Sequence, residues 1–213
     1  MAGTPAGELA RKLGVRTGRI VLPSGLLLIF AGAVLFVYPP HSGLLAFLFA
    51  VLGVAGFALG TARLAAAPWW ALGAAVALGF LLFAVLTVPG RGLALRMFGH
   101  SETCRVASRR EVDTTSRYPR YGFVHTIDCP GAGTLVIRTD SADRQPLGPV
   151  EVLDDPGGPL QPDFAERHNA VVDSLLVAAA FALTGAAVRV AWLRSANQGR
   201  RARRPRVPEA PED

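Results

Sequence analysis

The sequence predicts a membrane protein: an α-helical bundle of four spans with a small antiparallel β module, a partial barrel or sheet, inserted between spans three and four. Three observations predict this class. Residues 20–88 contain one formal charge, Arg63, among apolar and small residues. A second apolar run covers residues 170–193. The polar residues 89–169 between them include runs that alternate with the period of a β-strand.

Four segments are long enough to span a bilayer. A helix needs about 20 apolar residues to cross about 30 Å of hydrocarbon, and lipid forces such segments to be helical because it offers the backbone no hydrogen-bond partners. The first segment is followed by Pro39 and Pro40 and lacks a small-residue cleavage site, so it is expected to be an uncleaved anchor. The predicted spans are 20–38, 43–62, 69–88 and 170–193.

Arginine placement predicts the orientation. Basic residues near span ends are retained in the cytoplasm, and they gather in residues 1–19, in the short loop with Arg63, and in residues 194–213. The N-terminal arm and the C-terminal tail are therefore expected to be cytoplasmic, and residues 89–169 extracytoplasmic. The tail is also expected to be disordered, because it combines an arginine run with a segment rich in proline and acid; that run could bind anionic lipid or simply anchor the topology.

Net charge and amino-acid composition indicate which partners and which cell compartment to expect. The net charge of +6 comes from the two ends of the chain, while the large loop is nearly neutral, which argues against a nucleic-acid partner. Lys12 is the only lysine among 22 basic residues, and alanine, glycine, proline and valine are abundant. This bias is typical of a GC-rich bacterial genome, and the expected location is the bacterial cytoplasmic membrane.

Small residues recur at helical spacing within the predicted spans. Because helices in lipid gain little from burying apolar surface, such residues supply contact by letting backbones approach. They could form a dimerisation seam of a homo-oligomer or pack the spans of one chain. The pattern comprises Gly56 and Gly60, then Ala75 and Gly79, and finally Ala178, Ala182 and Ala186.

The two cysteines, Cys104 and Cys129, both fall in the loop that is expected to be exported, so a disulfide is predicted. Residues 104–112 and 121–129 each alternate in polarity, and we expect them to pair antiparallel around the turn between them. That register sets Cys104 opposite Cys129, Val106 opposite Ile127, and Val112 opposite Tyr121. The alternative is a metal site combining the cysteines with His125 or His100.

Two further strands are expected at residues 134–139 and 149–153, followed by a proline- and glycine-rich connector over residues 154–163. The residues VEVLDDPGGP at 150–159 match the pattern V-x-V-L-x-D-P-x-x-P. With the preceding spans, residues 104–167 resemble the bacterial membrane family called domain of unknown function 3592. The resemblance implies a small barrel-like β unit between transmembrane helices and implies no activity.

No constellation of catalytic, cofactor-binding or metal-binding residues emerges, so neither enzymatic activity nor a cofactor or metal is expected. The four histidines are scattered and lack ligand partners at metal spacing. The serines lack the flanks of a nucleophile elbow, and the glycines before residue 134 resemble turn residues rather than a phosphate loop. The residues considered are His41, His100, His125, His168, Ser24, Ser101, Gly131 and Gly133.

Ionisable residues are absent from the first three predicted spans, which disfavours a coupled transporter. In the fourth, Asp173 and Arg189 lie near the two ends, and Asp173 either faces the outer module or complements the helix dipole. We therefore expect an integral protein, embedded in the lipid bilayer, whose module contacts another envelope component. A small channel or transporter shaped by Pro39, Pro40 and the glycines of the second span is the alternative.

Overall fold

The computed structural model describes residues 5–39, 42–65, 69–114, 120–140 and 144–202. The chain divides into two compact units. The helical unit comprises residues 1–35, 42–84 and 178–213, and the module unit comprises residues 36–41 and 85–177.

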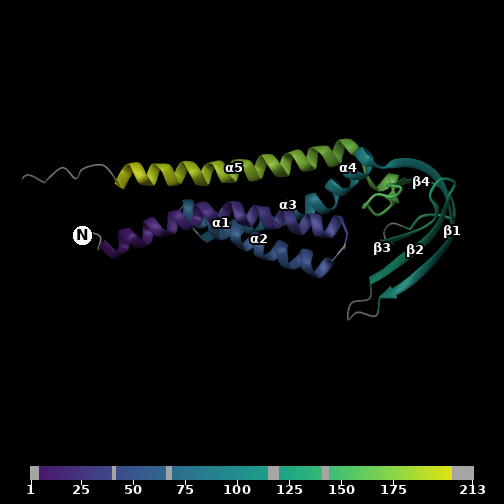
Figure 1. Cartoon of the computed structure of the whole chain (residues 1–213), viewed down its shortest axis with the longest axis horizontal. Coiled ribbons are helices and arrows are strands. Elements are labelled where there is room, and N and C mark those ends of the chain that lie inside the picture. Colours follow the sequence, from purple (N-terminus) through teal and green to yellow (C-terminus); the bar gives the residue numbers. More distant parts are fainter. Residues whose placement is uncertain (1–4, 40–41, 66–68, 115–119, 141–143, 203–213) are drawn as a thin grey trace, which may run out of the picture. The chain divides into compact units, whose positions relative to one another are not determined.

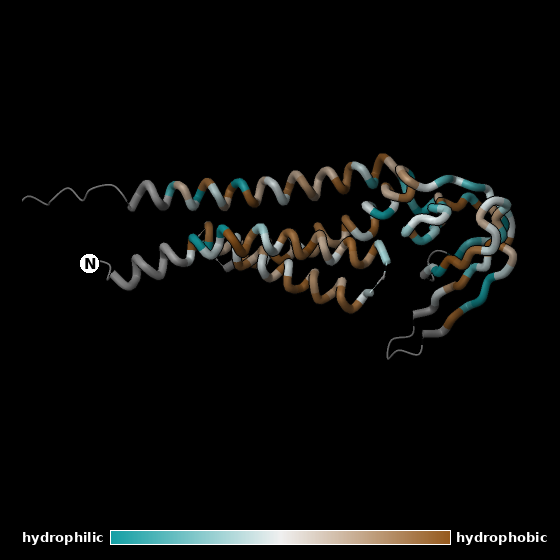
Figure 2. Tube along the Cα trace, viewed as in Figure 1, coloured by the Kyte–Doolittle hydropathy of each residue, from teal (hydrophilic) through white to brown (hydrophobic). Residues whose placement is uncertain are grey.

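Four helical stretches are long and apolar enough to cross a membrane, which confirms the four apolar helices predicted from the sequence. In Figure 2 brown and pale tan residues predominate along these helices, with teal at fewer positions. They belong to α1 (Pro5–Val37), α2 (Gly43–Ala65), α3 (Trp69–Thr87) with its extension α4 (Pro89–Phe98), and α5 (Ala170–Ala202).

Glycines let α1 and α2 approach backbone to backbone. A Cβ atom built at Gly25 would lie 2.3 Å from the backbone nitrogen of Phe57, and one at Gly60 would lie 2.6 Å from that of Leu22. The glycine pattern of the second predicted span is thus used for packing within the chain. The predicted alanine stripe of the fourth span is different, because its members are exposed in α5. The buried residues of that helix segment are Ala180, Thr184, Ala191 and Ser195.

Two element boundaries correct the sequence-based prediction. Helix α1, which covers the predicted span 20–38 up to Val37, begins at Pro5. Helix α5 continues to Ala202, so residues 194–202 are helical rather than disordered. Arginine, alanine and glutamine favour helix, which explains the extension. Residues 89–98, assigned to the β module, form helix α4; Pro89 fits there because the first helical position needs no amide donor. Residues 203–213 lie outside the described residues.

The module unit contains an antiparallel five-stranded sheet in the order β3-β2-β1-β4-β5. The sheet curves into a half-barrel, and β3 and β5 are its two edge strands (Figure 1). Residues 154–163, predicted as a connector only, also supply the start of β5. The strands are β1 (His100–Thr114), β2 (Arg120–Cys129), β3 (Gly133–Asp140), β4 (Gly148–Asp154) and β5 (Asp163–Phe164), and the 3₁₀ turn η2 (Ala165–Arg167) follows.

A β-bulge divides the pairing of β1 with β2. Val106 lies opposite Ile127 as predicted, but the register shifts between Val106 and Ser108. Beyond the shift, Val112 lies opposite Gly122 and not Tyr121, so the predicted register is wrong by one residue in the distal half of the hairpin. The bulge inserts one unpaired residue into β1, which bends the strand and increases its twist.

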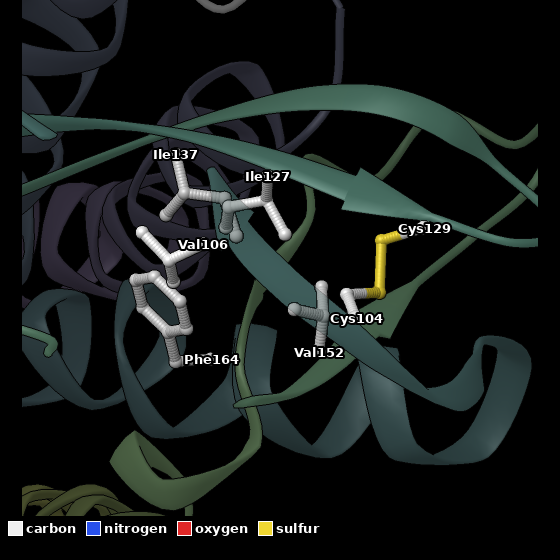
Figure 3. Packing of buried hydrophobic residues seen from close by; sticks show 7 residues of the cluster. All are labelled: Cys104, Val106, Ile127, Cys129, Ile137, Val152 and Phe164. Carbon is white, nitrogen blue, oxygen red and sulfur yellow. A yellow bond between two sulfur atoms is a disulfide. The ribbon is translucent and has the colours of Figure 1, made fainter. Parts of the chain in front are cut away.

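The module core lies on the concave side of the sheet. Cys104 and Cys129 are joined there by a disulfide with an S–S distance of 2.04 Å. Figure 3 shows the bridge beside the buried apolar side chains. All five strands contribute to this core, which consists of Cys104, Val106, Ile127, Cys129, Ile137, Val152 and Phe164. A second cluster joins α4 to β4 and η2 through Val37, Leu95, Leu153, Leu160 and Ala165.

Candidate functional site

Charged side chains converge on Asp163 within the module unit. Asp163 begins β5, Arg91 lies on α4, and Arg167 ends η2. His168 follows η2, and Asp173 lies in the first turn of α5. We call these five residues the Asp163 centre. Two of its members, Arg91 and Asp173, lie on helices that continue the predicted third and fourth spans.

The Asp163 carboxylate is buried and has partners at both oxygens. Arg167 Nη1 donates to Oδ1 at 3.0 Å, and the backbone N–H of Phe164 donates to the same oxygen at 2.9 Å. Oδ2 lies 3.2 Å from His168 Nε2 and 3.6 Å from Arg91 Nη2. Because only 7% of the side chain is exposed, this charge depends on its neighbours rather than on water.

These neighbours decide the ionisation of Asp163. Burial alone would raise the pKa of the carboxyl, because a low dielectric disfavours charge. The hydrogen bond with His168 and the positive charges of Arg167 and Arg91 outweigh burial, and the pKa of Asp163 lies below its ordinary value. The group is therefore a carboxylate at neutral pH.

The His168 imidazole lies between two carboxylates. Its Nε2 faces Asp163, and its Nδ1 lies 3.8 Å from Asp173 Oδ2, an oxygen that accepts no hydrogen bond among the described residues. Gly92 makes room for the ring, because a Cβ there would lie 2.3 Å from His168 Nδ1. Arg96 Nη2 donates to the backbone carbonyls of Ala165 and His168. The arrangement fixes the path of the chain from β5 into α5.

A pocket of about 430 Å³ opens beside Asp163, between the edge strand β3 and the segment around β5. One wall is rigid, because Arg91 Nη2 donates to the carbonyls of Gln161 at 3.1 Å and Pro162 at 3.4 Å. Arg138 is exposed on β3, and its side chain forms no hydrogen bond or ion pair with the rest of the described chain. We call this the arginine pocket; its lining is Arg91, Val136, Ile137, Arg138, Gln161, Pro162, Asp163 and Arg167.

The disulfide bears on the alternative of a metal site. Glu102, Cys104 and Cys129 form the only group of three potential ligands found in the described ranges. Both sulfurs are in the bridge, which leaves no thiolate for a metal, and the Glu102 carboxylate instead accepts a hydrogen bond from the Gly131 N–H at 2.6 Å. The bridge closes the β1–β2 hairpin at the end opposite its turn.

His125, the predicted partner in that alternative, lies in the module core. Its Nε2 accepts a hydrogen bond from the Gln145 N–H at 3.4 Å, and its ring meets Phe164 edge-on with centroids 5.4 Å apart. Burial, together with the positive charge of Arg109, lowers the pKa of His125 below its ordinary value. The imidazole is therefore neutral at pH 7 and serves as a core side chain.

The other residues considered in the sequence lie apart from the Asp163 centre. Ser24 Oγ donates to the Ile20 carbonyl of its own helix, and Ser101 Oγ donates to the Glu151 carboxylate. Gly133 has a φ of +73°, as expected of a turn glycine. Arg189 is exposed on α5, His100 is exposed at the start of β1, and His41 lies outside the described residues.

Sequence reasoning did not find the Asp163 centre. The sequence gives no reason to group Asp173 with His168, and it predicts a connector at Asp163. A signal was present, because charged residues flank both spans that adjoin the module within a few positions of their ends. That signal does not reveal which of these charges meet.

Comparison with known proteins found no matching family model, no matching curated protein and no matching solved structure. The resemblance to domain of unknown function 3592 therefore stays a prediction from the sequence.

Proposed function

We propose that this chain is a non-enzymatic, multi-pass protein of a bacterial cytoplasmic membrane that presents residues 89–169 outside the cytoplasm as a contact module for another envelope protein. The observation that carries the proposal is the disulfide between Cys104 and Cys129 in a sheet flanked by long apolar helices. Disulfides persist in oxidising compartments and are rare in the cytosol, so the bridge supports export of the module.

The surface of the helices supports a lipid environment. Large apolar side chains such as Leu27, Leu44 and Leu175 are exposed by 69%, 73% and 65%. Water would penalise this exposure by roughly 25 cal/mol for each Å² of apolar surface, whereas hydrocarbon would not. Together with arginine at the ends of the chain, this supports four crossings with both termini inside.

The module offers a surface for a partner where β1 bulges. A second pocket of about 370 Å³ lies there, lined by Arg105, Val106, Ala107, Asp128, Leu147 and Gly148. Leu147 is 63% exposed beside it, between an arginine and an aspartate. An exposed apolar side chain among charged neighbours is the composition of an interface anchor with a polar rim.

The channel or transporter alternative gains no support from the glycines of α2. Gly53 and Gly60 contact the backbone of α1, where added Cβ atoms would lie 2.7 Å from Ile29 N and 2.6 Å from Leu22 N. Positions filled by a neighbouring helix cannot line an open path. Self-association through the module stays an alternative identity for the partner.

Site-specific photo-crosslinking tests the proposal. A photoreactive amino acid at Leu147 in native membranes should give one defined adduct by mass spectrometry, and the same residue at the exposed Thr134 of β3 serves as the matched control. An adduct with a second copy of the chain would identify self-association. Recovery of the same abundant membrane proteins from both positions would refute a specific contact at this surface.

A further inference from the structure

The arginine pocket carries more positive than negative charge, and we propose that it binds the phosphate of an anionic phospholipid headgroup. This inference rests on the membrane embedding in the proposed function. It does not depend on which side of the bilayer the module occupies or on a protein partner.

Three arginines and one carboxylate line the pocket. Arg91 and Arg167 share a single carboxylate, that of Asp163, at 3.6 and 3.0 Å. Arg138 adds a third guanidinium with no ion pair to any described residue. The exposed guanidinium of Arg138, beside the Arg91–Asp163 pair, is therefore available to an added anion.

The geometry suits a phosphate. A guanidinium presents a planar fork of donors that matches two phosphate oxygens, and such charge-assisted pairs are stronger than neutral hydrogen bonds. Arg91 is held in place by the carbonyls of Gln161 and Pro162, while the exposed side chain of Arg138 can turn onto a ligand from the opposite wall. A volume of about 430 Å³ lies in the range of small-ligand sites.

Chain position distinguishes a lipid from a free anion. Arg91 follows the apolar run that ends at Val88, and Arg167 comes shortly before α5 begins at Ala170. Residues adjoining the ends of spans lie at the level of the headgroups, where basic side chains meet anionic lipid. Val136 and Pro162 add apolar lining that a glycerol backbone can contact.

Native mass spectrometry of the full chain in detergent micelles tests this inference. The chain is titrated separately with dioleoylphosphatidylglycerol and with zwitterionic dioleoylphosphatidylcholine. We expect phosphatidylglycerol to bind with a Kd at least tenfold lower. Arg138→Gln should weaken that binding at least fivefold without disturbing the fold, because this side chain is exposed and forms no ion pair with the described residues. Arg110→Gln, an exposed arginine of β1 outside the pocket, should leave it unchanged.

Each other result overturns the proposal. Equal affinity for the two lipids would exclude a site for anionic headgroups, and equal effects of Arg138→Gln and Arg110→Gln would place the binding elsewhere. Displacement of phosphatidylglycerol by millimolar inorganic phosphate would show that the pocket takes a free anion. Carbonate extraction of native membranes tests embedding separately, so the proposed function can fail independently of the pocket.

Discussion

At the residue scale, Asp163 combines burial with full ionisation. Its side chain contacts two arginines, one histidine and a backbone amide, and these partners together lower its pKa against the effect of burial. A buried charge with this many partners contributes little when intact, but it is costly to break, because the remaining charges are left without compensation.

Asp163→Asn should therefore destabilise the module by about 3 kcal/mol at pH 7, since it keeps the shape but leaves Arg91 and Arg167 without their carboxylate.

The pH dependence follows from the lowered pKa: the contribution is present above the ordinary aspartate pKa of about 3.9 and is lost as the pH falls through the lower folded-state value. Melting temperatures in detergent from pH 7 to pH 3 measure both effects. The gap between the wild type and the variant should narrow toward the acid end, and Glu111→Gln, at an exposed position of β1, should behave like the wild type. A constant gap at all pH values would contradict the role of this charge.

At the scale of elements, α1 and α2 are held by close backbone contact. Without a hydrophobic driving force in lipid, this contact depends on van der Waals packing, which requires glycine at the closest points. Helix α5 reaches α1 through larger side chains, with Phe30 and Phe181 stacked at 5.8 Å and Arg19 over Trp192 at 5.3 Å. The two pairings should therefore respond differently to added methyl groups.

Gly25→Ala should destabilise the helical unit by about 1–3 kcal/mol, because the new Cβ would lie 2.3 Å from Phe57 N and the helices must separate. Gly73→Ala in α3 is the matched control, since nothing lies within 4 Å of its Cβ position. Alanine is the better helix former, so the control should be neutral or slightly stabilising. Thermal unfolding in micelles checks both, and equal melting temperatures for the two variants would show that the contact is looser than described.

The elements predicted best from the sequence are those with a strong hydrophobic signal, either an unbroken apolar run or a period of two. The apolar helices follow from uninterrupted hydrophobicity, and the cysteine end of the β1–β2 hairpin follows from alternation around Val106 and Ile127. The β-bulge could not be predicted, because Ser108 and its polar neighbours carry no signal for which face of the strand is buried. The Asp163 centre could not be predicted for a different reason: its members come from α4, β5, η2 and α5, and no local pattern shows that these elements meet.

At the scale of the whole molecule, the two units draw their stability from different sources. In the proposed bilayer the helical unit relies on close packing of its helices, whereas the module buries an apolar core and adds a covalent bridge. The bridge spans a sequence separation of 25 residues. By the chain-entropy model, closing such a loop contributes about 3 kcal/mol.

The proposed topology predicts opposite accessibility for two exposed positions. Arg110→Cys in the module should react with a membrane-impermeant maleimide in intact cells, because the module lies outside. Asn197→Cys near the end of α5 should react only after the cells are permeabilised. Mass shifts of the purified chain report the labelling. The reversed pattern would place the disulfide and the arginine pocket in the cytosol.

A half-barrel that stops short of closure keeps two borders to which a foreign strand could add. Two features disfavour the addition of a strand at these edges. The edge strand β5 is only two residues long and follows Pro162, which has no amide to donate. The other edge strand, β3, carries the charge of Arg138. Such features disfavour strand addition between copies of the chain, so the open sheet should not polymerise through its edges.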